Sequence, residues 1–305
     1  MGKQTIKSIS QYHKLRGLPK PKHPLVSLID YSEIAHQSNL TEISTVPEFY
    51  AIGFKKNIPG KFRYGQSDFD FDEGVMSFFS PNQVIYYETI KEKQEFKPAG
   101  WLLFIHPDFL WNTNLVTEIR NYDFFGYAIN EGLFLSIDEE EIITQIFKNI
   151  AKEYHSKIDE MSKSIILAQV ELLLKYAERF YKRQFITRDK LNNSILTKTE
   201  TLLSEYFNRG LSLENGLPNV EYIANELHLS PNYLSNLLKQ TTGKSTQVHI
   251  HEKLIEKAKE KLSSSLLTVN EIAYELGFER PESFSRLFKD KTKISPLEFR
   301  KKFQN

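Results

Sequence analysis

The hydrophobic and polar positions in the last third of the chain follow one plan twice. Residues 220–243 and residues 269–296 each open with apolar positions at helical spacing, pass through a turn, and resume with a second helical stripe. The first helix has the apolar pair Ile223-Ala224 in one copy and Ile272-Ala273 in the other. The copies lie about 50 residues apart and number only two, which predicts a duplicated helix-turn-helix rather than a solenoid.

The second helix of each copy has its own start signal and its own inward face. Ser230 is a suitable N-cap, and Pro231 suits the first helical position because no N–H is needed there. Pro281 opens the matching helix of the second copy. The positions predicted to pack inward are Tyr233, Leu234, Leu237 and Leu238 in the first copy, and Phe284, Leu287 and Phe288 in the second.

The opposite face of each second helix is polar. A single polar helix face is usually only a solvated surface, but two such helices at one spacing, each after a matching helix and turn, favour double-stranded DNA as the partner. Amides, hydroxyls and arginine read base edges in a major groove, and lysine suits phosphates. The predicted DNA-facing residues are Asn232, Ser235, Asn236 and Lys239 in the first copy, and Glu282, Ser283, Arg286 and Lys289 in the second.

Three segments carry a resemblance to a known family. SPNYLSNLLKQTTG, LIEKAKEKL and, above all, EIAYELGF…SFSRLFK…SPLEFR resemble the DNA-binding domain of AraC/XylS-family transcription regulators. The resemblance covers residues 220–303 and implies a domain at about 195–305, with two helix-turn-helix units joined by a long helix at about 246–263. It also implies that the recognition helices enter successive major grooves about 34 Å apart. By the family pattern the residues other than Lys239 and Lys289 face bases, and these two lysines lie near phosphates.

The chain departs from the family pattern at three positions. His228 stands where a turn glycine is usual, whereas Gly277 keeps that glycine in the second copy. Histidine tolerates a left-handed backbone better than most residues, so we expect the turn to form. Lys293 replaces the glycine before the final Ser-Pro, at a cost of about 1 kcal/mol. Leu254 stands where the family commonly has an arginine in the joining helix.

The first half of the chain reads differently, as short apolar runs separated by Gly and Pro. The runs at 25–30, 49–54, 69–88 and 101–107 predict a small all-β barrel or sandwich at about 25–135. AraC-type regulators often carry a cupin-like barrel here, and GVMSFFSPNQ resembles a strand pair of that barrel. Residues 1–24 are predicted to be a polar arm, because the prolines of LPKPKHP prevent a helix. The fold class expected for the whole chain is therefore α+β.

From residue 136 to about 183 the apolar period changes to that of helices. Ile142, Ile146, Phe147 and Ile150 mark one helix, and a second helix from about Ile165 is apolar around much of its surface. A helix of that kind is buried on more than one side. It can pack only on the barrel, or it can also form a homodimer through the helices between Ser136 and Tyr181, as the resemblance implies. We predict an effector-sensing and dimerisation domain at 25–188, and a linker near 189–194.

Candidate chemistry in this half is limited. If the barrel binds a small-molecule effector, aromatic side chains should line the site, and the candidates are Tyr64, Phe69, Phe71, Phe78 and Trp101. Each of them could equally be core. No histidine pair with cupin spacing occurs before residue 200; His249 and His251 fall in the predicted joining helix, where positions i and i+2 point to different sides. We therefore predict no metal site, no cofactor and no enzymatic activity.

Composition bears on the partner and on the cellular location. The net charge is only +1, yet residues 280–305 hold eight Lys and Arg against three Asp and Glu, which suits phosphate contacts. The absence of cysteine, of an apolar N-terminal segment and of a membrane-length apolar run predicts a cytoplasmic protein. The sequence thus predicts a sequence-specific transcription regulator. The alternatives are an architectural DNA-binding protein and a cupin-like enzyme fused to a DNA reader.

Overall fold

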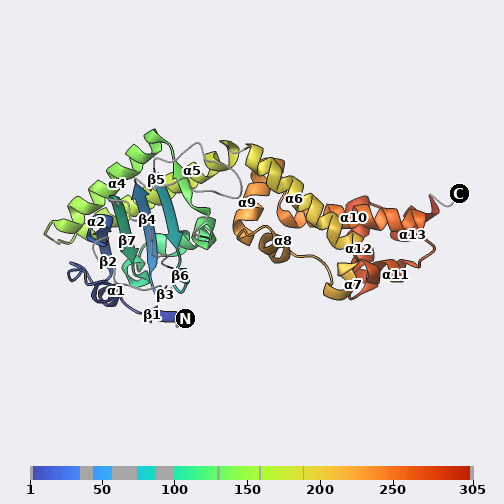
Figure 1. The fold of residues 1–305 in the computed structure, drawn as a ribbon, viewed down its shortest axis with the longest axis horizontal. Helices are drawn as coiled ribbons and strands as arrows, with labels where there is room; N and C mark the ends of the chain where they lie inside the picture. The colour runs from blue at the N-terminus through green and yellow to red at the C-terminus, as the bar shows by residue number, and fades with distance from the viewer. Residues whose placement is uncertain are drawn as a thin grey trace, which may run out of the picture. The chain divides into compact units, whose positions relative to one another are not determined.

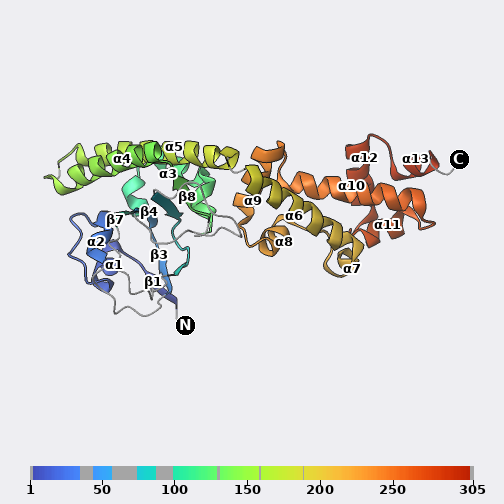
Figure 2. The ribbon, with the colours of Figure 1, turned by 45° about the horizontal axis from the view of Figure 1, so that its top comes forward.

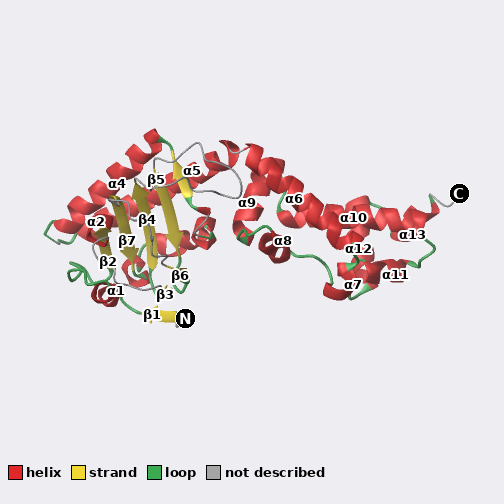
Figure 3. Ribbon diagram, viewed as in Figure 1, coloured by secondary structure: helices red, strands yellow, loops and turns green. Residues whose placement is uncertain are grey.

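The computed structural model divides the chain into two compact units, Met1–Gln184 and Phe185–Asn305 (Figure 1). It describes residues 3–34, 44–56, 74–86, 99–128, 131–157, 159–187 and 189–302. The first unit combines strands with helices, whereas the second contains only helices among its described residues (Figure 3). Within the described ranges, no helix combines the length and the apolar character needed to cross a membrane. The α+β character expected from the sequence is confirmed.

The first unit is built on an antiparallel sheet of five strands in the order β2-β7-β4-β5-β8. These strands are β2 (Val26–Asp30), β4 (Tyr50–Lys56), β5 (Gly74–Phe79), β7 (Ala99–Ile105) and β8 (Leu133–Leu135). A second sheet contains β1 (Lys3–Ile6), β3 (Ser44–Pro47) and β6 (Ile85–Tyr86). The described strands form two open sheets, so the predicted cupin-like barrel is not confirmed.

The segment GVMSFFSPNQ forms one strand and a turn rather than a strand pair. Strand β5 belongs to the five-stranded sheet, whereas β6 pairs with β3 in the other sheet. The chain turns between the two at Pro81-Asn82, where Asn82 has a φ of 67°. Asparagine is one of the few residues that enter this left-handed region readily. The turn therefore leads the chain out of the first sheet.

Two long helices, α4 (Ile137–His155) and α5 (Ser162–Thr187), cover one face of the five-stranded sheet (Figure 2). Ser136 and Glu139 form a capping box at the start of α4, which satisfies two backbone N–H groups. The register pairs Phe54 with Trp101, and the Trp101 ring stacks on Phe147 of α4 with ring centres 5.6 Å apart. This face of the sheet is therefore closed by aromatic packing.

The opposite face of the sheet is covered by the N-terminal residues, which do not form the predicted polar arm. Helix α1 (Ile9–Leu15) follows β1, and Ser8 caps it. Ile6, Ile9 and Tyr12 lie three residues apart and are buried together, with the Tyr12 ring 4.6 Å from that of Phe104. Ile6 ends β1, whereas Ile9 and Tyr12 share one face of α1, a short apolar signal that the polar neighbours obscured. The proline-containing stretch after residue 17 is non-helical, as predicted.

A buried hydrogen-bond network fixes these N-terminal residues to the sheet. His13 bonds through Nδ1 to the carbonyl oxygen of Pro19 and through Nε2 to the Ser27 hydroxyl on β2 at 2.9 Å. The Tyr154 hydroxyl on α4 accepts from the backbone N–H of Lys22 at 2.9 Å. Burial lowers the pKa of His13 below its ordinary value, against smaller opposing effects of the Pro19 carbonyl and Glu33. The imidazole is therefore a proton-sensitive contact.

Helix α5 also closes the free edge of the sheet at β8. The side chain of Gln184 accepts from the Phe134 N–H at 2.8 Å and donates to the Gly132 carbonyl at 3.2 Å. Arg183 donates to the Phe134 carbonyl at 2.8 Å and pairs with Glu139 of α4. An edge strand normally exposes unpaired backbone N–H and C=O groups. Here side chains of α5 bond to those groups at β8.

The second unit is helical, and its elements match the predicted positions closely. They are α6 (Asp189–Asn208), α7 (Leu211–Asn215), α8 (Val220–Glu226), α9 (Pro231–Thr242), α10 (Thr246–Ser264), α11 (Val269–Glu275), α12 (Pro281–Thr292) and α13 (Pro296–Lys301). Residues 189–194, predicted as a linker, are instead the first turns of α6. Their polar side chains are compatible with a helix, and Asn192 is buried and bonds to the Phe185 carbonyl.

Helix α10 lies against α6, α9, α11 and α13. Its Leu254, Ala258 and Leu262 are fully buried in a core shared with α6, α11 and α12. Leu254 therefore serves as a core residue where the family commonly has arginine.

Short helices complete the first unit: α2 (Tyr31–Ile34), α3 (Leu115–Glu118), and 3-10 turns at Pro107–Leu110, Ile119–Asn121 and Asp123–Gly126.

The turns of the two repeats adopt the same left-handed backbone with different residues. His228 has a φ of 56° and Gly277 a φ of 92° at the first turn, while Gly243 and Lys293 have 75° and 68° at the second. The expected left-handed histidine is thus confirmed. Of these four residues, only Gly277 also needs glycine because of close packing. A Cβ there would lie 2.6 Å from the carbonyl carbon of Gly216.

This difference predicts unequal costs for two similar substitutions. Gly277→Ala should lower the free energy of unfolding by about 1–3 kcal/mol, because it adds both a steric overlap and a disfavoured φ. Gly243→Ala is the matched control, since nothing lies within 4 Å of its added Cβ, and it should cost only about 1 kcal/mol. Denaturant unfolding of the two variants measures the difference, and equal costs would contradict the close-packing argument.

The His13 network predicts an acid-sensitive fold. The ordinary pKa of 6.5 applies in the unfolded chain, and the folded pKa lies below it. Well above pH 6.5 both states are neutral at this position, and as the pH falls through 6.5 toward the lower folded pKa the unfolded chain binds the proton first. The free energy of unfolding should therefore decrease between about pH 7.5 and about pH 5.5, and decrease less in His13→Gln. Denaturant titrations at both pH values would measure this, and an identical decrease in the two proteins would exclude His13 as a source.

Candidate nucleic-acid interface

The second helix of each repeat is formed by the start signals and apolar stripes predicted from the sequence. The Ser230 hydroxyl accepts from the Tyr233 N–H at 3.3 Å, and Pro231 occupies the first helical position of α9. Helix α12 begins at Pro281. The inward positions are buried or partly buried: Tyr233, Leu234, Leu237, Leu238, Phe284, Leu287 and Phe288. Both helices are therefore fixed by their apolar faces and keep their polar faces outward.

The predicted DNA-facing residues lie on these outer faces with different exposure. Asn232, Lys239, Glu282, Arg286 and Lys289 are exposed. Ser235, Asn236 and Ser283 are half-buried. The structure brings the first-copy residues together on α9 and the second-copy residues together on α12.

The repeat identifies one residue that the sequence interpretation missed. With Pro231 matched to Pro281, Asn232 matches Glu282 and Asn236 matches Arg286. In the same alignment Ser235 corresponds to Ser285, and Ser283 corresponds to the buried Tyr233. Ser285 therefore occupies the outer-face position equivalent to Ser235. The constant offset of 50 residues between the two second helices would have identified Ser285 from the sequence.

The charge pattern separates these outer faces from α10. Four lysines on α10 or just before it pair with acidic partners: Lys244 with Glu252, Lys253 with Glu256, Lys257 with Glu260 and Lys261 with Glu275. Lys259 lies instead over the Phe299 ring. The pairing lowers the pKa of Glu260. Across the described ranges of the chain, Lys239, Arg286 and Lys289 have no acidic group within ion-pair distance. The unpaired cations of α9 and α12 can therefore meet phosphates or base edges.

The two histidines of α10 have hydrogen-bond partners within their own unit. His249 Nε2 bonds to the Thr242 hydroxyl at the end of α9 at 2.9 Å, and His251 Nε2 bonds to the Gln247 side chain at 2.9 Å. Burial lowers the pKa of both rings, against an opposing effect of Glu252 at His249 and with the help of Lys291 at His251. Among the residues that the structure describes, no three His, Asp or Glu side chains gather as metal ligands would.

The candidate effector residues do not share one site among the described residues. Tyr64, Phe69 and Phe71 lie outside the described part of the chain. Phe78 and Trp101 lie on the same sheet face, but Trp101 stacks on Phe54 and Phe147 whereas Phe78 packs on Phe124 at 4.5 Å. Phe78 is therefore a core residue, and Trp101 is half-buried against aromatic neighbours.

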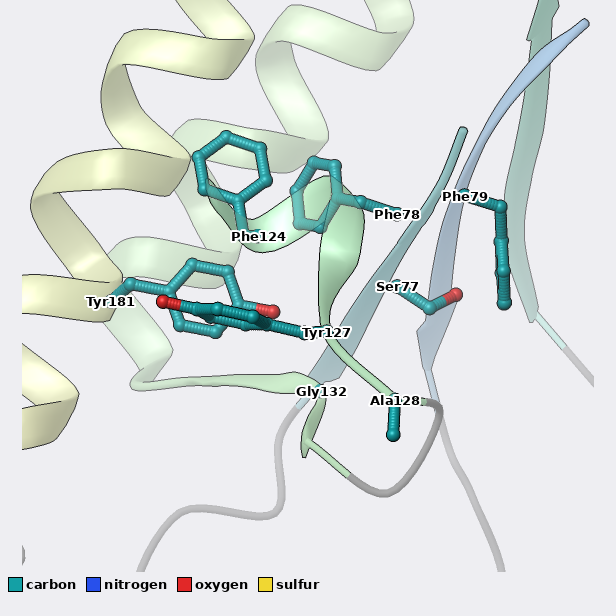
Figure 4. A pocket seen from close by; sticks show the side chains of 8 residues that line it. All are labelled: Ser77, Phe78, Phe79, Phe124, Tyr127, Ala128, Gly132 and Tyr181. Atoms are coloured by element: carbon teal, nitrogen blue, oxygen red, sulfur yellow. The ribbon is translucent and has the colours of Figure 1, made fainter. Parts of the chain in front are cut away.

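Phe78 also lines a small cavity, shown in Figure 4. The Tyr127 and Tyr181 rings close one side of it, with centres 5.2 Å apart and nearly perpendicular planes. The cavity has room for about one water molecule. Its full lining is Ser77, Phe78, Phe79, Phe124, Tyr127, Ala128, Gly132 and Tyr181.

Comparisons with known proteins agree with this geometry. The sequence profile of a family described as "Helix-turn-helix domain" matches residues 223–302. The uncharacterized HTH-type transcriptional regulator YfiF of Bacillus subtilis is 28% identical over 221 residues, which cover 72% of this chain and 63% of that protein. The uncharacterized HTH-type transcriptional regulator YijO of Escherichia coli is 34% identical over 85 residues, covering 28% of this chain and 30% of that one. The chain thus spans less than two thirds of the length of these relatives.

Among solved structures, the C-terminal domain of AraT, a response regulator from Geobacillus stearothermophilus, is 30% identical. That match covers 35% of this chain and 84% of the other, with a TM-score of 0.32. The assignment depends on the duplicated helices, their caps and the profile match. On these grounds residues 223–302 form a helix-turn-helix domain of the AraC/XylS type.

Proposed function

We propose that this protein is a sequence-specific DNA-binding transcription regulator that inserts α9 and α12 into successive major grooves. The main support for the proposal is that α9 and α12 each have an outward polar face. On these faces the cations Lys239, Arg286 and Lys289 lack acidic partners within the described residues. Two relatives named as HTH-type transcriptional regulators support it. The proposal includes a cytoplasmic location and no enzymatic activity.

The two helices have different recognition chemistry. The outer face of α9 offers the amides Asn232 and Asn236, which suit adenine, whereas α12 offers Arg286, which suits guanine, and Glu282, which suits cytosine. Ser283 is a further base-facing candidate. Lys239 and Lys289 follow one helical turn later and suit phosphates, where they would fix register and orientation.

The first unit would form the homodimer and receive the signal. Ile165 and Leu172 are each 41% exposed and lie seven residues apart on α5, so they share one face of the helix. An apolar stripe of that spacing suits the same helix of a second copy. A small-molecule effector, if it binds a cupin-like arrangement of this unit, would act by favouring one placement of the paired DNA-binding units over another.

The DNA proposal predicts different consequences for two cations on α12. Arg286→Ala should weaken binding by about 1–3 kcal/mol and relax preference at one base pair, because a bidentate base contact is lost. Lys289→Ala should weaken binding to all sequences alike and flatten the salt dependence. Selection of random duplexes by the purified full-length proteins, followed by titrations at several salt concentrations, measures both effects.

Two outcomes would contradict this prediction. Uniform weakening by Arg286→Ala would remove its assignment as a base reader. If random duplexes competed as well as selected ones for the unsubstituted protein, sequence-specific regulation would be excluded in favour of architectural binding.

The dimer proposal predicts that a charge on the α5 stripe separates the subunits. Leu172→Glu should convert a dimer to a monomer, because two buried carboxylates would face each other without partners. Leu213→Glu is the matched control, because Leu213 is 64% exposed on α7 in the other unit, and it should remain dimeric. Sedimentation at equal protein concentrations measures the difference. Dimers of unchanged stability in Leu172→Glu would exclude this surface.

A further inference from the structure

A buried hydroxyl at the start of α10 depends on Ser235 of α9. The Thr246 side chain is 0% exposed, and its Oγ1 lies 3.2 Å from the Ser235 Oγ. In the described part of the chain, Ser235 is the hydrogen-bond partner of this hydroxyl and no other contributes. A buried hydroxyl that loses its partner destabilises the structure that contains it. The Ser235 hydroxyl is therefore engaged inside the protein, although its position on α9 is that of a DNA-facing residue.

A second contact links the end of the same helix to α10. The Thr242 hydroxyl donates to the Leu238 carbonyl at 2.8 Å, and its oxygen lies within hydrogen-bond distance of His249 Nε2, at 2.9 Å. Ser235 and Thr242 lie seven residues apart, which places both on one side of α9. Together they connect this side of the helix to the first turn of α10 at two points.

The second repeat lacks both contacts. Pro296 stands at the position of Thr246 and carries no hydroxyl, and Phe299 stands at the position of His249. The Phe299 ring instead packs against Phe288 of α12, with ring centres 5.5 Å apart. Helix α12 is therefore held by ring packing, and the polar bridge is a property of the first repeat alone.

We propose that Ser235 is a positioning residue rather than a base reader. Its bond to Thr246, with the Thr242–His249 bond, sets the angle at which α9 is presented to DNA, and Asn232 and Asn236 make the base contacts. This inference deepens the proposed function and rests on it. It departs from the family pattern, which places a base-facing residue at this position. Small rotations of a recognition helix move its amides out of hydrogen-bond range, so loss of the bridge should impair all contacts of α9 together.

The test is a double-mutant cycle of Ser235→Ala and Thr246→Val on the full-length protein. Thr246→Ser keeps the hydroxyl and is the rescue variant. Asn232→Ala is the matched control, because Asn232 is exposed on the same helix. Unfolding free energies are measured first without DNA, and base preferences are then measured by selection from random duplexes.

The proposal expects the same result from both bridge variants. Each single variant and the double variant should lose roughly threefold to tenfold in the ratio of selected-site to random-duplex affinity, since one hydrogen bond is lost in every case. The loss should spread over all base pairs read by α9 and spare those read by α12. Thr246→Ser should restore the ratio, and Asn232→Ala should alter one base pair only.

Other results would overturn it. If Ser235→Ala changes preference at one base pair and Thr246→Val leaves it unchanged, Ser235 reads a base. If the unfolding free energies of the two variants are additive, the bridge does not exist. If the unsubstituted protein selects no sequence, the proposed function falls and the positioning role falls with it, while the unfolding cycle separately reports on the bridge.

Discussion

The burial of one face of α10 is the constraint on which the second unit depends. Ile250, Leu254, Ala258 and Leu262 are all buried and recur at helical spacing along its 19 residues. A rigid helix of that length spans about 28 Å. Both helix-turn-helix repeats pack on it, so their separation is set by a hydrogen-bonded rod and not by a flexible linker. An arginine at position 254 would place a charge in this core, which explains in physical terms why leucine suits this chain.

Much of the second unit could be predicted because its signals are local. Ser230-Pro231 and Pro281 mark helix starts within one or two residues, and left-handed turns are marked by Gly243 and Gly277. Two segments differ from what the sequence predicted, and the reasons are different. Residues 189–194 carry no apolar stripe but still continue as helix, and Ile9 and Tyr12 form an apolar face of α1 too short to stand out among polar neighbours. The cupin-like barrel depends on pairings between distant strands, which no local signal specifies.

The candidate interface shows the same division between local and distant information. Helical spacing was enough to predict that Asn232, Arg286 and Lys289 face outward. It could not show that Ser235 faces Thr246, because that contact depends on the angle between α9 and α10. Ser283 stays a prediction, and the offset of 50 residues between the repeats adds Ser285 as the equivalent of Ser235. Residue type and periodicity thus identify a surface, whereas the role of a half-buried polar residue requires its partner.

The second helices of both repeats are fixed by buried apolar faces, but their further contacts differ in chemistry. Hydroxyl and imidazole contacts add to the packing of α9, whereas the Phe299 ring adds to the packing of α12. Burial of apolar surface is non-directional, whereas a hydrogen bond weakens steeply when its geometry changes. The orientation of α9 is therefore more narrowly defined by its contacts but more easily lost with any one of them.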